Sequence, residues 1–222
     1  MKKVSLILSS VLIIAMMLTS FRGSVSKEEV ASKQVTIGKQ VWMTENLNVD
    51  KFRNGDPIPE AKTDEEWEKA GINGQPVWCY YNNDRTNGVE YGKLYNWYAV
   101  NDPRGLAPEG LHVPSDEEWT TLDDFLGEGD VSTKMKSTSG WTDNEGESGN
   151  GTNESGFSGL PGGGRYSDGT FSLIGMNGVW WSSSEDAVPG DAWYRVLGYN
   201  HINLFRNSYS KADGWSVRCI MD

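Results

Sequence analysis

The sequence predicts an α+β domain in which short strands alternate with two or three helices and much loop. Apolar and polar residues alternate near the start of the domain, as they do in a strand with one buried face. Two later segments begin with Thr or Ser followed three residues on by Glu, the pattern that caps a helix. From Trp141 onward, short apolar runs are separated by Gly, Asn, Ser and Asp, which is typical of strands joined by turns.

The first 26 residues have the layout of a secretory signal peptide. Two lysines precede an apolar run over residues 4–18, which is shorter than the ~20 apolar residues that a membrane span needs. Ser24 and Ser26 fit cleavage after Ser26, and a cut near Ser20 is the alternative. We therefore expect an exported protein that is secreted, periplasmic or at the cell surface, with no transmembrane anchor after leader removal. The first cysteine is Cys79, so no thiol near the leader could accept a lipid.

Composition favours one acidic, aromatic-rich domain over residues 34–222. Removal of the leader takes away three basic residues and no carboxylate, which leaves 17 basic and 31 acidic residues. Such a surface should repel nucleic acid, so no nucleic-acid partner is expected. No Pro-rich or Ser-rich linker divides the chain. Ten Trp, nine Tyr and six Phe indicate a core that depends on aromatic area.

The first elements of the domain are expected to be a hairpin and a short helix. Residues alternate from Val35 to Met43 around a turn at Gly38, and the exit of this hairpin continues to Val49. Thr63 is followed three residues later by a glutamate, which predicts an N-cap and a brief peripheral helix that carries Trp67.

Two further helices and a set of strands follow. The apolar residues between Tyr91 and Asn101 favour a buried helix. Ser115 and Glu118 form a capping box at the clearest helix start, and Gly127 stands where a helix C-cap prefers glycine. In the strand-rich second half, the pair Asp168–Gly169 indicates a hairpin turn, with calcium chelation as an alternative.

Cys79 and Cys219 are the only two cysteines of the chain. Both lie in apolar, strand-like surroundings, and an oxidising compartment favours a disulfide between them. The alternative is a pair of unpaired buried thiols. Two cysteines without a histidine cluster do not predict a zinc site.

Six strings in a consistent order resemble the signature of the Fibrobacter succinogenes major paralogous domain. They are GKLYNWYAV (92–100), LAPEGLHVPSDEEW (106–119), GFSGLPGGGR (156–165), GVWWSSSE (178–185), AWYR (192–195) and GWSVRC (214–219). The resemblance covers about residues 34–220, nearly the whole chain after the leader.

The same features are distantly similar to formylglycine-generating enzymes and to the wider C-type-lectin-like fold. This resemblance implies an α+β domain with two or three helices on a small twisted antiparallel sheet, paired termini, and a loop-rich, ligand-facing segment over residues 141–215. The formylglycine-generating enzyme uses a reactive cysteine pair to bind copper and activate oxygen. Here Cys219 matches a terminal structural position and Cys79 has no vicinal partner, so we expect no enzyme of this kind.

Other catalytic or metal-binding groups are few. His112, at the entry to a helix, is expected to be a packed or capping residue, and His201 to have a structural role in a polar hairpin. Glu185 and Asp186 could serve glycoside hydrolysis only as facing carboxylates in a cleft. Together with Asp191 they are also candidate calcium ligands, although the sugar-selecting motif of calcium-dependent lectins is absent. No other cofactor is expected.

Two functions from different classes follow from these features. The first is a non-catalytic, extracytoplasmic binding domain for a glycan, because aromatic rings with amides and Arg suit sugar faces and hydroxyl edges. Its candidate ligand-binding residues are Trp181, Glu185, Trp193, Tyr199, Asn200, Asn203 and Arg206. Each of these tryptophans has core packing as its alternative role. The second function is a structural or adhesion protein that contacts an envelope protein through its loops, and a hydrolase is a distant third.

Overall fold

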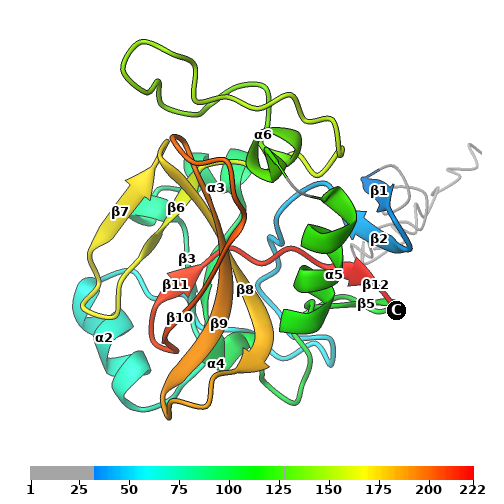
Figure 1. Ribbon diagram of the computed structural model, residues 1–222. Helices are drawn as coiled ribbons and strands as arrows, with labels where there is room; N and C mark the ends of the chain where they lie inside the picture. Colours follow the sequence, from blue (N-terminus) through cyan, green and yellow to red (C-terminus); the bar gives the residue numbers. More distant parts are fainter. Residues whose placement is uncertain (1–32, 128) are drawn as a thin grey trace, which may run out of the picture.

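This computed structural model describes residues 33–127 and 129–222. These residues contain three antiparallel sheets and five α-helices, joined by loops (Figure 1). The predicted α+β class is confirmed. The number of helices exceeds the two or three expected, and three small sheets replace a single one. The predicted signal peptide, residues 1–26, lies outside the described residues.

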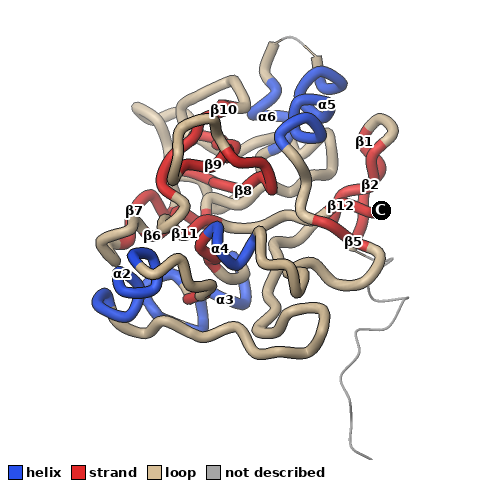
Figure 2. Tube along the Cα trace, turned by 90° about the horizontal axis from the view of Figure 1, so that it is seen from below, coloured by secondary structure: helices blue, strands red, loops and turns tan. Residues whose placement is uncertain are grey.

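The first sheet joins the two ends of the domain. Its order is β1 (Gln34–Ile37), β2 (Gln40–Met43), β12 (Ile220–Met221) and β5 (Leu111–His112). Gly38 makes the β1–β2 turn with φ 63°, so the predicted hairpin is confirmed. Ile220 pairs with Trp42, which places the C-terminal strand beside the N-terminal hairpin, as the resemblance implied (Figure 2).

The second sheet is the centre of the molecule. It has the order β10 (Phe205–Ser210), β9 (Asp191–Gly198) and β8 (Asn177–Glu185). Helix α5 (Asp116–Leu126) packs against β8 and β9. The predicted capping box at its start is confirmed, with Ser115 and Glu118 bonded to each other's backbone groups, and Gly127 ends the helix at φ 78°.

The third sheet has the order β3 (Trp78–Cys79), β4 (Leu94–Asn96), β11 (Gly214–Trp215), β6 (Gly162–Arg165) and β7 (Phe171–Ile174). Around it lie α2 (Asp64–Ile72), the 3-10 helix η1 (Tyr81–Asn83), α3 (Arg85–Tyr91) and α4 (Trp97–Val100). The predicted Thr63 cap of α2 is confirmed. The predicted turn at Asp168–Gly169 is also present, since it joins β6 to β7.

One expectation for local structure was wrong. The predicted helix over residues 91–101 divides into strand β4 and the one-turn helix α4, because Leu94 and Tyr95 pair with neighbouring strands and Asn96 caps a new helix start. The strands predicted from Trp141 onward are confirmed, since residues 141–215 contain β6 to β11. The long loop with little regular structure runs from the end of α6 (Val131–Met135) to β6 (Figure 1).

The core is aromatic, as the composition predicted. Trp42, Trp119, Trp180 and Phe157 are fully buried between α5, the central sheet and the first sheet. The ring centroids of Trp42 and Trp119 are 4.7 Å apart. A second cluster around Trp181, Trp215 and Tyr95 fills the space between the central and third sheets.

The expected disulfide is absent, because Cys79 and Cys219 are both free and buried. Cys79 packs in a cluster with Trp67 and Leu94, whereas Cys219 belongs to the separate cluster that contains Trp215. Burial raises the pKa of both thiols to about 12. The alternative of two unpaired buried thiols is therefore the one that the structure shows.

Within the described ranges, no helix combines the length and the apolar character that crossing a membrane would need.

Candidate functional site

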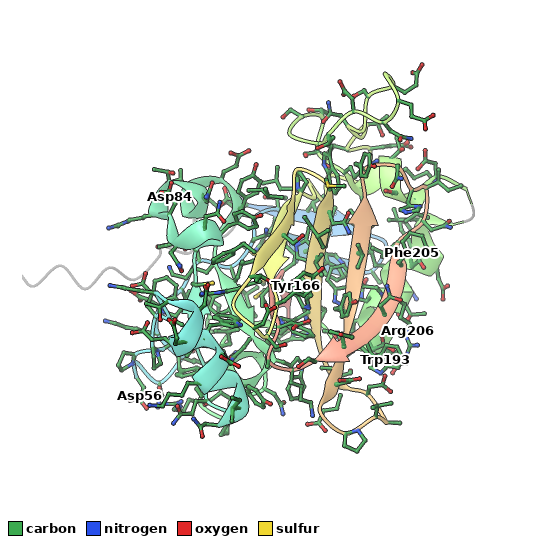
Figure 3. The ribbon with its side chains drawn as sticks, turned by 90° about the vertical axis from the view of Figure 1, so that its left-hand side faces the viewer. Asp56, Asp84, Tyr166, Trp193, Phe205 and Arg206 are labelled. Atoms are coloured by element: carbon green, nitrogen blue, oxygen red, sulfur yellow. The ribbon has the colours of Figure 1, made fainter. Side chains whose placement is uncertain are left out.

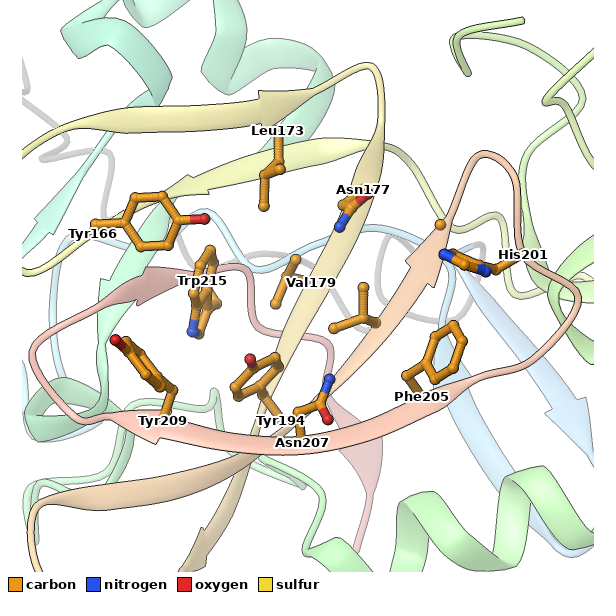
Figure 4. A pocket seen from close by; sticks show the side chains of 12 residues that line it. Tyr166, Leu173, Asn177, Val179, Tyr194, His201, Phe205, Asn207, Tyr209 and Trp215 are labelled. Atoms are coloured by element: carbon orange, nitrogen blue, oxygen red, sulfur yellow. The ribbon is translucent and has the colours of Figure 1, made fainter. Parts of the chain in front are cut away.

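A pocket of about 680 Å³ opens on the face of the central sheet opposite to α5. We call it the aromatic pocket. It is lined by Tyr166, Leu173, Asn177, Val179, Tyr194, Val196, Gly198, His201, Phe205, Asn207, Tyr209 and Trp215. Figure 4 shows Tyr166 and Leu173, from the β6–β7 hairpin, on one side of the strand surface and Tyr209, Asn207 and Phe205 on the other.

Strand alternation explains which side chains enter the pocket. In β9, Tyr194 and Val196 face the pocket while Arg195 between them faces α5. Tyr194 stands opposite Asn207 of β10, and Val196 stands opposite Phe205, so both strands present the same face. The floor of the pocket is therefore formed by side chains on neighbouring strands of the central sheet, and residues of the third sheet border it.

One end of the pocket, which we call the tyrosine end, consists of Tyr166, Tyr194, Tyr209 and Trp215. The rings of Tyr194 and Trp215 have centroids 5.7 Å apart, and Tyr166 meets the Trp215 ring edge-on at 5.8 Å. Trp215 is nearly buried at 3% exposure, whereas Tyr209 is 56% exposed at the rim. This end therefore offers flat apolar faces together with three phenolic hydroxyls.

The other end holds His201 and Phe205. The His201 and Phe205 rings meet edge-on with centroids 4.9 Å apart. The amides of Asn177 and Asn207 lie between the two ends (Figure 4). Because an amide both donates and accepts hydrogen bonds, it can bind hydroxyl groups in either sense.

Two polar atoms at or beside the tyrosine end have no hydrogen-bond partner among the described residues. They are Nε1 of Trp215 and Oδ2 of Asp213. Asp213 is completely buried, and its other oxygen, Oδ1, accepts a hydrogen bond from the Ser167 backbone at 2.9 Å. Such atoms are rare in folded proteins and require an explanation.

Charges and burial at this end shift two pKa values upward. Burial, and then the charges of Asp168 and Asp191, raise the pKa of Asp213 to about 7. Burial, followed by the nearby Asp213 charge, raises the pKa of Tyr194 to about 12. The Tyr194 hydroxyl therefore stays protonated, and the Asp213 carboxyl titrates near neutral pH.

Leu173 projects over the pocket from a strained backbone conformation. Its φ of 72° lies in the left-handed region, which costs a non-glycine residue on the order of 1–3 kcal/mol. Gly163 on the neighbouring strand has φ 60°, and a side chain there would collide with the backbone of Ser172. The glycine thus permits the irregular β6–β7 pairing that holds Leu173 at the pocket wall.

Trp193 and Arg206, two predicted ligand-binding residues, lie on the opposite face of the central sheet. The Arg206 guanidinium stacks on the Trp193 ring at 3.3 Å and binds the Asp116 carboxylate of α5 at 2.8 Å. Figure 3 shows the two labelled side chains close together near one end of the sheet and separated from Tyr166. They form one contact with the helix and do not take part in the aromatic pocket.

Trp181, Tyr199, Asn200 and Asn203 have different positions. Trp181 is completely buried and donates its indole N–H to the Tyr95 carbonyl at 2.8 Å, so its alternative role in core packing is the one observed. Tyr199 is partly buried, and Asn200 is exposed in the loop that carries His201. Asn203 borders a separate hollow beside the end of α5.

The three candidate calcium ligands have other contacts or remain apart. Glu185 pairs with Lys211 at 3.4 Å, and the Asp186 carboxylate accepts a hydrogen bond from Ser208 that lowers its pKa. Asp191 opens strand β9. In residues 33–127 and 129–222, no three His, Cys, Asp or Glu side chains gather where they could hold a metal ion. Calcium binding stays a prediction.

His112 was expected to be a packed or capping residue; it does not cap the helix itself, since Ser115 is the N-cap of α5, but it contacts Glu118 of the capping box. Its Nδ1 lies 2.9 Å from Asp222, and its Nε2 lies 2.9 Å from Glu118 in the capping box. Burial opposes protonation of His112, but hydrogen bonds and charges from Glu118 and Asp222 outweigh it, so the pKa is raised. The ring joins β5, α5 and the chain terminus.

Sequence reasoning missed the aromatic pocket, since none of its twelve lining residues was among the predicted ligand-binding residues. Tyr166, Tyr194, Phe205, Tyr209 and Trp215 were not among the predicted site residues. The period-two alternation of β9 was a usable signal, because it places Tyr194 and Trp193 on opposite faces. The role of Trp215 could not be recognised this way, since its strand has only two residues.

Comparison with known proteins identifies the family of the chain. The family described as the Fibrobacter succinogenes major domain matches residues 35–221, which is nearly all of the described structure. No curated protein and no solved structure matches the chain. The C-type-lectin-like fold implied by the sequence therefore stays a prediction. The chain belongs to the Fibrobacter succinogenes major domain family.

Proposed function

We propose that this chain is an exported, non-catalytic binding domain that holds a saccharide in the aromatic pocket. The observation that carries the proposal is the chemistry of the lining: six of the residues are aromatic or imidazole rings, two are amides, and none of the twelve has a charged carboxylate, ammonium or guanidinium side chain. The volume of about 680 Å³ is within the range of small-molecule sites.

A saccharide suits this lining on both of its surfaces. The C–H faces of a pyranose ring are apolar and pack against flat aromatic rings such as those of Tyr194 and Tyr209. The hydroxyl groups at its edge need donors and acceptors, which Asn177, Asn207 and the phenols supply. The export that the first 26 residues predict would favour this function, because it would bring extracellular and envelope polysaccharides within reach.

Calorimetric titration of the purified protein with soluble neutral oligosaccharides tests this function. We expect Tyr209→Ala to weaken binding about tenfold, since this exposed ring can leave with little effect on the core. Trp193→Ala is the matched control, because it removes an aromatic ring from the opposite face of the same sheet. We expect the control to bind as tightly as the unchanged protein.

Three results would contradict the proposal. They are no binding of any saccharide at millimolar concentration, equal losses in the two variants, or a loss confined to Trp193→Ala. Titration in the presence of a calcium chelator should give the same affinity, since no carboxylate lines the pocket among the described residues. Release of shorter sugars during the titration would instead favour the hydrolase alternative.

A further inference from the structure

The two unpartnered polar atoms beside the aromatic pocket are complementary in chemistry. Trp215 Nε1 is a hydrogen-bond donor only, and Asp213 Oδ2 in its ionised form is an acceptor only. Both are buried, and neither has a partner among the described residues. Leaving such buried groups unpaired destabilises a protein, so a missing partner is the economical explanation.

The two side chains lie near the same end of the pocket. Asp213 directly precedes β11 (Gly214–Trp215), and its Oδ1 accepts a hydrogen bond from the backbone N–H of Ser167, the residue that follows the pocket-lining Tyr166. Trp215 lines the pocket, and the nitrogen edge of its indole lies toward the rings of Tyr194 and Tyr209 in Figure 4. The Asp213 charge acts on Tyr194, which places the carboxyl near the same end of the pocket.

A hydroxyl group is the chemical partner that satisfies both atoms at once. It accepts a hydrogen bond through its lone pairs and donates one through its own proton. An anionic group could accept from Trp215, but it would meet the negative charges of Asp213, Asp168 and Asp191 without any cationic residue in the lining. This arrangement favours a neutral, hydroxyl-bearing ligand.

We propose that Trp215 and Asp213 act as a recognition pair for one hydroxyl of a neutral saccharide: the hydroxyl oxygen accepts a hydrogen bond from Trp215 Nε1–H, and the hydroxyl O–H donates one to Asp213 Oδ2. This inference rests on the proposed function, because it requires that a saccharide occupies the aromatic pocket. Beyond the proposed function, the pair should select neutral sugars over acidic ones, and Trp215 and Asp213 are the residues responsible.

The exchange Asp213→Asn tests the pair with little change in shape. The new amide oxygen can still accept from the Ser167 backbone, while its NH₂ group replaces the acceptor Oδ2 with a donor. The probes are the methyl glycosides of glucose, galactose, mannose, xylose and N-acetylglucosamine, with glucuronic acid as the acidic counterpart of glucose. We expect Asp213→Asn to lose about tenfold in affinity for the neutral sugar that binds best.

Asp191→Asn is the control, because it removes a neighbouring negative charge from a residue that does not line the pocket. We expect it to bind the neutral glycoside as the unchanged protein does. Glucuronic acid should bind more weakly than methyl glucoside to the unchanged protein.

The NMR signal of the Trp215 indole N–H gives a second readout. It is measured on the unchanged protein, so it does not depend on whether the Asp213→Asn variant folds. Addition of the neutral glycoside should shift the Trp215 Nε1–H signal downfield, with Trp215→Phe used only to assign it, while the Trp193 signal stays in place. If no glycoside binds the unchanged protein, both the proposed function and the pair are refuted. If glycosides bind but Asp213→Asn keeps full affinity, or the Trp215 signal does not move, the pair alone is refuted.

Discussion

At the scale of single residues, Asp213 is a buried carboxyl group whose pKa is raised well above its usual value. The carboxyl is completely buried and has one hydrogen bond to a backbone N–H. Burial penalises the ionised form, and Asp168 and Asp191 add like charge, so the pKa rises to about 7. A group that destabilises the fold at neutral pH is typical of a functional site.

The pH dependence of the unfolding free energy should reveal the cost of ionising the buried Asp213 carboxyl. The folded protein binds the Asp213 proton more tightly than the unfolded chain does, so the unfolding free energy falls as pH rises from about 4 to about 7. The loss from this one group is on the order of 4 kcal/mol. We expect Asp213→Asn to match the unchanged protein near pH 4 and to exceed it in stability at pH 8, as measured by urea unfolding.

Other titrating groups occur in both proteins and cancel in this difference. Asp191→Asn serves again as the control, since it should show no comparable gain at pH 8. A variant that lost stability at every pH would mean that the carboxylate itself supports the fold. Gained stability together with lost sugar affinity is the combination that a purely structural aspartate would not give.

The two thiols give a prediction about redox conditions. Cys79 and Cys219 are buried in separate clusters, and burial raises the pKa of each to about 12, so almost no reactive thiolate is present at pH 7. We expect the folded protein to react with a thiol reagent only after denaturation, and then at two sites. Its melting temperature should be the same with and without dithiothreitol. A lower melting temperature in the presence of dithiothreitol would contradict the two free thiols and support a disulfide between them.

Single residues could be predicted only where a neighbour in the sequence determines their role. Cys79 and Cys219 were plausible partners from compartment and surroundings, but pairing depends on which clusters they enter. Trp181 and Trp193 were both plausible ligands, yet one is buried and the other stacks on Arg206. The sequence shows a tryptophan's chemistry but not the face on which its strand will present it.

At the scale of elements, one carboxylate of α5 joins the helix to two arginines of the central sheet. Asp116 in its first turn accepts hydrogen bonds from Arg195 and Arg206. The Arg195 side chain is only 2% exposed, so this contact neutralises a buried cation. Burial alone would raise the pKa of Asp116, but the two guanidinium groups outweigh it and lower the pKa.

Removing that carboxylate should be costly. We expect Asp116→Asn to lower the unfolding free energy by about 3 kcal/mol at pH 7, because Arg195 would remain buried without an anionic partner. The measurement is urea unfolding followed by tryptophan fluorescence. The lowered pKa of Asp116 also means that the gain from the pair disappears in the unchanged protein as pH falls through the acid range.

Glu117→Gln is the matched control in the same helical turn. Glu117 is exposed, so its loss should change the unfolding free energy by less than about 0.5 kcal/mol. Equal losses in both variants would point to the helix dipole as the source of the effect and would contradict the role of the buried pair.

Elements were predictable where their signals are local. The capping box of α5 and the glycine turn of the first hairpin depend on residues within one turn of each other, and both are confirmed. The segment 91–101 failed because its apolar residues satisfy a helical pattern while Leu94 and Tyr95 pair with distant strands. Strand pairing over long separations overrides local periodicity.

At the scale of the whole molecule, most of what matters is non-local. Strand β11 near the C-terminus lies between β4 and β6, and β12 lies between β2 and β5. The lining of the candidate pocket comes from strands of two sheets and is spread over residues 166–215, so no short window of sequence contains it. The family match covers residues 35–221 as one unit, in agreement with a domain whose ends must meet before it is complete.

Arg218 is the residue that joins these distant parts. It is fully buried, and its guanidinium donates to the carbonyls of Met43 and Phe157 and to the side-chain oxygen of Asn46. Its ring contacts are with Phe157 and Trp180. No carboxylate pairs with it through a salt bridge in the described structure, and burial lowers its pKa to about 9. This cation near the C-terminal end of the domain is held by neutral acceptors from its N-terminal segment and from the long loop before β6.

Loss of this guanidinium should therefore destabilise the molecule as a whole. Arg218→Met keeps most of the side-chain volume but leaves the carbonyls of Met43 and Phe157 without these donors, and we expect a loss of roughly 3 kcal/mol in unfolding free energy. Arg85→Ala, at an exposed position of α3, is the control and should cost less than about 0.5 kcal/mol. Hydrogen exchange should show β2 and β12 losing protection together with β8 and β9. If Arg218→Met were as stable as the control, or if only β12 became exposed, the two ends of the chain would be held together by strand pairing alone.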